Sequence, residues 1–176
     1  MSYENIENLA CLVQKAFIDA CAALNNNTLS QEQRKAVESL PFDNITKSAD
    51  NRLKKFPNDC CMDASIVLAI IFTAIAEQNG FEYNQLMHIR CRPTAKTKTP
   101  MFDFHQWLRV DGYDVDIAFK QCKTVLQGNE GKVIFDIHPL IGSDDFSYER
   151  ADAIIEEPFT TFANFIITNY FSQREE

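Results

Sequence analysis

The spacing of apolar residues over the first 40 positions predicts two helices. From Tyr3 to Leu24, apolar side chains recur at three- and four-residue steps, which is typical of one face of an amphipathic helix. Three asparagines end this segment, and Ser30 with Gln33 three positions later forms a capping box that opens a shorter helix. Pro41 should stop the second helix. The polar connection that follows, 41–57, is long enough to be a functional-loop candidate.

A third helix is predicted in the middle of the chain, from Cys61 to Glu77. It is almost wholly apolar between Ala64 and Ala76, and Asn79-Gly80 supplies a residue suited to a left-handed helix end. A helix that is apolar on all sides should be buried.

The second half of the chain predicts strands and a final helix. Asp111-Gly112 is a strong hairpin signal, so the runs on either side of it should pair antiparallel. The remaining stretch 142–157 has no regular pattern and is interpreted as irregular. The expected elements are strands Leu86–Cys91, Phe104–Val110, Tyr113–Ala118 and Lys132–Ile137, and an amphipathic helix from Phe159 to Phe171.

This order predicts an α+β fold in which a buried central helix packs on an antiparallel β-sheet. The 176 residues, 45% apolar and 24% charged, fit one domain spanning 1–176. Within it we expect N-terminal helices over 3–40, a core over 56–140 and a C-terminal helix over 159–172.

Charge and targeting signals narrow the expected partners. The net charge is −8 and no basic cluster compensates for it, so neither nucleic acid nor an anionic membrane is expected as a partner. The first residues lack the pattern of a signal peptide, and a cytoplasmic location is expected, with export by a specialised route left open. The six cysteines are expected to be free thiols. The oligomeric state is not predicted.

Cys60 and Cys61 are the first candidates for chemistry. They lie just before the predicted buried helix, where unpaired N–H groups and the helix dipole favour an anion and lower the pKa of a thiol. The alternative interpretation is that both are small core residues, because free cysteine is often buried.

His105 is the second candidate, on the strand Phe104–Val110. Alternation places His105, Trp107 and Arg109 on one face. Asp114 and Asp116 follow on the returning strand, and a carboxylate there can hold the imidazole by its other nitrogen. We predict that only one of the two aspartates approaches His105, on the reasoning that they face opposite sides of the strand.

Other chemistries receive little support from the sequence. His88 and His138 have no cysteine or carboxylate partner that the sequence identifies. Adjacent cysteines do not give the spacing of a zinc knuckle, and there is no phosphate-binding glycine loop and no nucleophile elbow. No metal and no cofactor is therefore expected.

Two phrases of the sequence carry a family resemblance, Phe56-Pro57-Asn58-Asp59-Cys60-Cys61-Met62-Asp63-Ala64-Ser65 and His105-x-Trp107-Leu108-x-Val110-Asp111-Gly112-x-x-Val115-Asp116-Ile117-Ala118. They resemble the transglutaminase-like core of the papain-like cysteine enzymes. In that core a cysteine begins a buried helix, a histidine starts a His-x-Trp strand and an aspartate lies on the next strand. Small uncharacterised bacterial proteins with a similar Cys-Cys-x-Asp-Ala-Ser phrase are closest, although they have glycine in place of Asp59 and Met62. Gln106 and Ala118 also depart from the usual pattern.

The resemblance implies a papain-like fold and a triad of Cys61, His105 and Asp116. Cys61 would attack a carbonyl as thiolate, His105 would move the proton and Asp116 would orient His105, giving a thioacyl intermediate. Backbone N–H groups at the helix start, and speculatively Asn58, would stabilise the oxyanion. Cys60 is the alternative nucleophile.

The implied activity is acyl transfer on a protein or peptide amide. A peptidase or amidase would use water as acceptor, and a transglutaminase-type transamidase would use an amine. The competing hypothesis is a non-catalytic acidic binding module, of the antitoxin or immunity type, that keeps the papain-like core as a scaffold.

Overall fold

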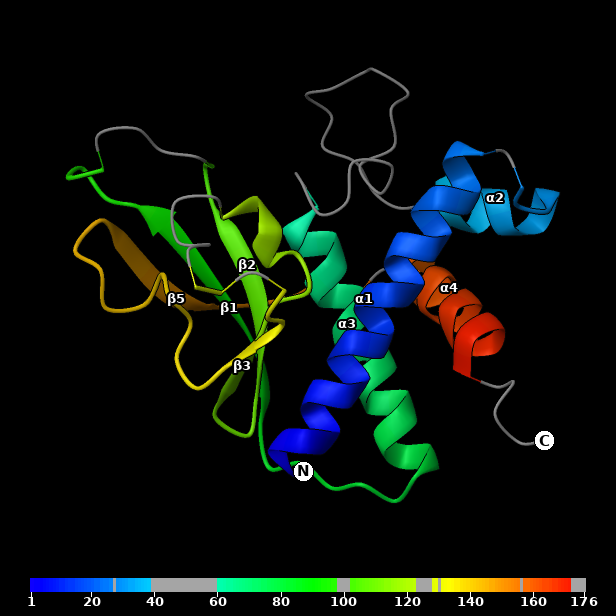
Figure 1. Cartoon of the computed structure of the whole chain (residues 1–176), viewed down its shortest axis with the longest axis horizontal. Coiled ribbons are helices and arrows are strands. Elements are labelled where there is room, and N and C mark those ends of the chain that lie inside the picture. Colours follow the sequence, from blue (N-terminus) through cyan, green and yellow to red (C-terminus); the bar gives the residue numbers. More distant parts are fainter. Residues whose placement is uncertain are drawn as a thin grey trace.

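A computed structural model describes residues 1–26, 28–38, 60–97, 102–122, 128–129, 131–155 and 157–171. Within these ranges the chain is a mixed α+β fold, with helices packed on an antiparallel sheet (Figure 1). The helices are α1 (Tyr3–Asn25), α2 (Gln31–Glu38), α3 (Cys61–Gln78) and α4 (Glu157–Ile166), which continues as a π-helical turn (Ile167–Phe171). The strands are β1 (Leu86–Pro93), β2 (His105–Val110), β3 (Tyr113–Val115), β4 (Ile134–Phe135) and β5 (Phe146–Ala151).

The five strands lie in the order β4-β3-β2-β1-β5, and every neighbouring pair is antiparallel. The hairpin predicted at Asp111-Gly112 is confirmed, with Val110 opposite Tyr113. Asp111 and Gly112 have φ of +49° and +92°, values that a two-residue hairpin turn requires and that glycine adopts without steric cost.

Three strand expectations were wrong. The strand expected over Lys132–Ile137 is shorter and covers only Ile134–Phe135. The stretch 142–157, interpreted as irregular, contains β5, which pairs with β1 along its whole length. Most β5 side chains are exposed at the sheet edge, so the strand lacks the apolar alternation that would have marked it. The strand from Tyr113 also ends at Val115, so Asp116 lies just beyond it.

Both faces of the sheet are covered. Leu108, Val110 and Val115 belong to the large apolar cluster that includes α1, α3 and α4. Ile89 and Trp107 belong to a smaller cluster with residues of the loops after β3 and β4. Because β2 has a core on each side, nearly all of its residues are buried.

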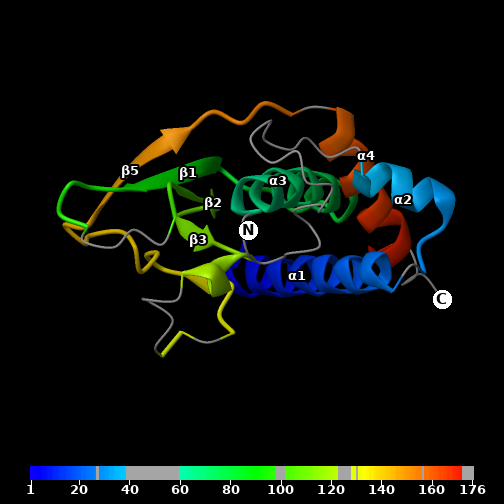
Figure 2. The same cartoon turned by 90° about the horizontal axis from the view of Figure 1, so that it is seen from above.

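Helix α3 is the central element. Figure 2 shows it running beside α1, with the sheet near its N-terminal end and α4 beyond it. Most of its residues from Cys61 to Phe72 are buried, as an apolar helix of this kind requires. Its length and hydropathy alone would also suffice to cross a membrane, but 61% of it is buried inside the protein.

Candidate active site

The first turn of α3 places the two adjacent cysteines in different environments. Cys60 is the N-cap residue and its carbonyl accepts the N–H of Ala64 at 2.8 Å, whereas Cys61 is the first residue of the helix. Both are buried, with Cys60 1% and Cys61 7% exposed. Cys61 therefore stands where the free N–H groups of the first turn begin.

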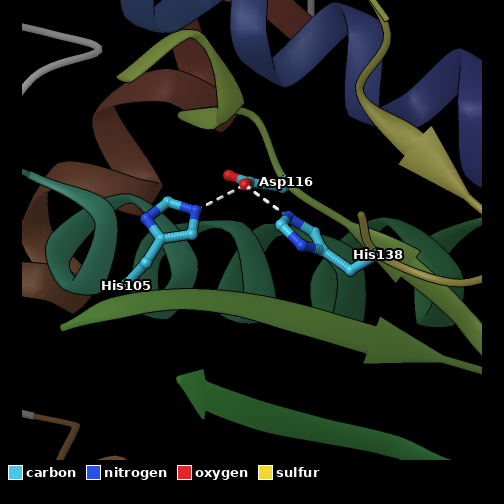
Figure 3. A group of neighbouring side chains, drawn as sticks. All are labelled: His105, Asp116 and His138. Atoms are coloured by element: carbon cyan, nitrogen blue, oxygen red, sulfur yellow. Dashed lines mark hydrogen bonds and ion pairs between the residues drawn. The ribbon is translucent and has the colours of Figure 1, made fainter. Parts of the chain in front are cut away.

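His105 opens β2 and is fully buried against Asp116. Its Nε2 lies 2.6 Å from Oδ2 of Asp116 (Figure 3). The other carboxylate oxygen, Oδ1, accepts the backbone N–H of Ala118 at 2.9 Å. The short segment after β3 thus fixes both oxygens of Asp116, and the aspartate holds one side of the imidazole.

Three thiols surround the same imidazole. Cys61 and Cys122 both lie within hydrogen-bond reach of the His105 side chain. Cys91 stands directly opposite His105 in the pairing of β1 with β2. Because Nε2 faces Asp116, Nδ1 is the nitrogen left for Cys61 and Cys122. The structure therefore brings together Cys61, His105 and Asp116, and adds Cys122, which the sequence reasoning did not identify.

Ionisation in this cluster is uneven. Burial disfavours the charged form of His105, but the charge and hydrogen bond of Asp116, helped by the two thiols, raise its pKa well above the ordinary value. Burial opposes ionisation of Asp116 too, yet His105 and His138 together hold the pKa of that carboxyl well below its usual range. The imidazolium and carboxylate forms are therefore favoured.

The thiols at the back of the site are poor candidates for the thiolate. Burial raises the pKa of Cys91 to about 12, although His105 opposes this shift. Burial also raises the pKa of Cys122, against the same opposition from His105. Neither thiol is therefore favoured as the nucleophile, and neither lies at a helix start as Cys61 does.

His138 is a buried member of the site that the sequence did not reveal. Its Nε2 lies 3.1 Å from Oδ2 of Asp116, on the side away from His105 (Figure 3). The N–H of Leu140 donates to its Nδ1 at 3.2 Å, so the ring proton sits on Nε2 and is donated to Asp116. Burial lowers the pKa of His138, which keeps the ring neutral and consistent with this tautomer.

Trp107 and Asp114 hold His138 in place. The His138 ring stacks on Trp107 with centroids 4.0 Å apart and planes at 14°. Asp114 accepts the indole N–H of Trp107 at 2.8 Å, both guanidinium N–H groups of Arg109 at 2.7 Å and the backbone N–H of His138 at 2.8 Å. Asp114 is thus committed to a structural network.

This network corrects the reasoning about the two aspartates. Only Asp116 approaches His105, as expected, but the two do not face opposite sides. Asp114 lies on β3 and Asp116 just beyond its end, and both contact side chains on one face of β2, Asp114 with Trp107 and Asp116 with His105. The two aspartates differ in their partners, because the Asp114 carboxylate already accepts hydrogen bonds from Arg109 and Trp107.

A side-chain bridge sets the distance between α3 and β2. The amide of Gln106 donates to Ser65 Oγ at 2.9 Å, and that hydroxyl donates to the carbonyl of Met62 at 2.8 Å. The Gln106 carbonyl oxygen accepts from Arg90 at 3.0 and 3.2 Å. The residue after His105 is therefore tied to the first turn of the helix that carries Cys61.

The donor atoms of His105, Asp116 and His138 all lie within 4.8 Å of one another, a grouping that could hold a metal ion. The contacts of 2.6 and 3.1 Å between them are hydrogen-bond distances, however. Ligands of one tetrahedral zinc, about 2.0–2.1 Å from the metal, stand more than about 3 Å apart. The proton on His138 Nε2 also occupies the lone pair that a metal needs. The geometry fits a hydrogen-bonded chain better than a metal centre.

The remaining candidates lie elsewhere. Asn58, the speculative oxyanion donor, falls outside the described residues. His88 is on β1 and faces a separate cavity at the other end of α3. Comparisons of the chain with protein-family models, with curated proteins and with solved structures found no match.

Proposed function

We propose that this protein is a cysteine-dependent acyl-transfer enzyme on a papain-like, transglutaminase-like core. The observation that carries the proposal is the buried His105 ring, which has Asp116 on its Nε2 side and the thiol of Cys61, at the start of α3, within hydrogen-bond reach. A nucleophile, a base and a group that orients the base are the three parts that thiol catalysis needs.

The reaction begins with the Cys61 thiolate beside the His105 imidazolium. The sulfur attacks the carbonyl carbon of an amide, and the C–S bond forms as the carbonyl electron pair moves to oxygen. Free N–H groups at the start of α3 are the candidate donors to this oxyanion. When the C–N bond breaks, His105 gives its proton to the leaving amine and a thioester remains.

Release of the acyl group reverses the proton movement. His105, now neutral, takes a proton from the incoming acceptor, which attacks the thioester and expels the Cys61 thiolate. Water as acceptor makes the protein a peptidase or amidase, and an amine makes it a transamidase. Protein or peptide amides are the proposed substrates.

His138 extends the proposed machinery as a positioning residue. Its N–H and the Ala118 N–H bind different oxygens of Asp116, so the carboxylate is held on two sides while Oδ2 still faces His105. A carboxylate fixed in this way keeps the imidazole in one orientation.

Thiol alkylation tests the proposal without a known substrate. Iodoacetamide at mildly acidic pH, followed by peptide mass mapping, should find one fast-reacting thiol in the wild type. Cys61→Ser should remove it, whereas Cys60→Ser and Cys122→Ser should retain it. If the fast thiol survives in Cys61→Ser, the nucleophile passes to Cys60 or Cys122. If no thiol reacts faster than Cys11, which is exposed, the non-catalytic binding module is the better description.

A further inference from the structure

A second site lies at the opposite end of α3 from Cys61. A cavity of about 490 Å³ opens between the C-terminal half of α3, the start of β1 and the segment that joins β5 to α4. In Figure 2 residues 152–155 run alongside α3 in the direction of α4. The nearest α3 residue in the cavity wall, Ala69, follows Cys61 by eight positions, or about 12 Å of helix. The volume is that of pockets that bind small molecules.

The cavity is lined by a buried imidazole with one ring nitrogen that is unpaired among the described residues. His88 is 8% exposed, and its Nδ1 is buried without a hydrogen bond to any described residue. Leaving a buried polar atom unpaired costs about 1–3 kcal/mol, so such atoms often mark functional positions. Burial, with a smaller contribution from Arg90, lowers the pKa of His88 to about 4, and the ring is neutral at pH 7. It therefore offers a lone pair as well as one N–H.

Two carboxylates give the cavity a negative charge. Glu77 on α3 and Asp152 after β5 both line it, and neither forms an ion pair within the described part of the chain. Arg150 is the single basic residue of the lining, but it stands opposite Ile89, whose side chain belongs to the cluster on the other face of the sheet. Its Cα–Cβ bond therefore points toward that face of the sheet rather than toward α3.

The rest of the wall is mostly apolar, with two hydroxyl groups from Thr73 and Thr160. Ile70 and Leu86, both partly buried, line the cavity together with Ile155, which is 60% exposed. The combination is a mostly apolar wall, an imidazole lone pair and two carboxylates without an ion pair among the described residues. A ligand that satisfies all of them carries N–H donors and a positive charge on an apolar body.

We propose that this cavity binds a small organic amine, with its apolar part against Ile70 and Leu86 and its ammonium group toward the carboxylates and His88. The inference is independent of the chemistry at Cys61, because it rests on a different set of residues.

Three probes with a common body test the proposal. Phenethylamine, phenethyl alcohol and 3-phenylpropionate share an aromatic ring and differ in charge. Titration calorimetry and saturation-transfer NMR on the full chain should show that the amine binds at least about tenfold more tightly than the alcohol, and that the carboxylate does not bind.

Variants locate the binding. Glu77→Gln and Asp152→Asn should each weaken phenethylamine binding about threefold or more, and His88→Leu should weaken it about tenfold. Glu4→Gln, which removes the same charge from the exposed start of α1, should leave it unchanged, as should Cys61→Ser. Equal affinity for the amine and the alcohol overturns the proposal. So does full affinity in the Glu77→Gln/Asp152→Asn double variant, which does not depend on whether His88→Leu folds.

Discussion

At the scale of single residues, the site separates two buried aspartates that stand two positions apart. The Asp116 carboxylate accepts hydrogen bonds from His105, His138 and one backbone N–H. The Asp114 carboxylate accepts hydrogen bonds from Trp107, Arg109 and the backbone N–H of His138. Asp116 therefore orients the His105 imidazole, and Asp114 holds the residues that surround it.

This separation predicts different defects for the two amide variants. Asp116→Asn should slow Cys61 alkylation at pH 6 by about tenfold or more, because the imidazolium loses its counter-charge. Asp114→Asn should lower the free energy of unfolding by about 1–3 kcal/mol, because it weakens a buried ion pair, and should leave most of the Cys61 reactivity. Alkylation rates and urea unfolding of both variants check this. Full reactivity in Asp116→Asn would contradict the proposed role of that residue.

The role of His138 can be separated from its packing. His138→Phe keeps an aromatic ring against Trp107 but removes the N–H that binds Asp116. We expect the pH midpoint of Cys61 alkylation to change and the rate at pH 6 to fall about three- to tenfold, because Asp116 and the imidazole that it orients lose a fixed position. His138→Gln, which retains an N–H donor, should recover part of the rate. A purely structural role for His138 would instead lower the stability of both variants and leave the pH midpoint unchanged.

The sequence predicts the residues of the site only where local pattern identifies them. The helix start marks Cys61, and the hairpin places Asp116 near His105. His138 contacts Asp116 and Cys122 contacts the His105 imidazole, both from segments without a periodic pattern, so no residue spacing in the sequence identifies them. His138 was visible only as one of three histidines in the chain.

At the scale of elements, strong local sequence patterns were sufficient to predict a helix or a hairpin, and weak patterns were not. The buried helix α3 and the β2–β3 hairpin follow from an apolar run and from Asp111-Gly112. The edge strand β5 is specified by backbone pairing with β1 rather than by its own exposed side chains, so its sequence resembles a loop.

The hairpin offers a direct test of backbone strain. Gly112 has φ of +92°, which is costly for a residue with a Cβ atom, although a Cβ at this position would contact nothing within 4 Å. Gly112→Ala should therefore lower the free energy of unfolding by about 1–2 kcal/mol, purely through conformation. Gly112→Asn should cost less, since asparagine tolerates positive φ better. Urea denaturation of the two variants measures this, and equal losses would argue against the conformational explanation.

At the scale of the whole molecule, the buried histidines give stability a dependence on pH. His88 has its native pKa lowered to about 4 by burial and Arg90. The unfolded chain takes up this proton below about pH 6.5, so His88 favours folding at neutral pH and this contribution is lost as the pH falls toward 4. His138 acts with the same sign, whereas the raised pKa of His105 stabilises the fold at low pH and is lost as the pH rises through that value.

The contribution of His88 can be isolated by comparing wild type with His88→Leu. Between pH 6.5 and 4 the wild type should lose up to about 3 kcal/mol more unfolding free energy than the variant. Urea unfolding at four or five pH values in this range checks the difference. Parallel curves for the two proteins would show that His88 is protonated in the folded state and that its burial is not decisive.

The continuity of α3 links the two ends of the molecule thermodynamically. Its first turn carries Cys61 and its later turns form a wall of the cavity, without a break between them. A ligand that displaces this helix in the cavity changes the binding of a reversible electrophile at Cys61 by some factor, and that electrophile must change the affinity of the cavity ligand by the same factor. The coupling free energy can therefore be measured from whichever end is easier to titrate.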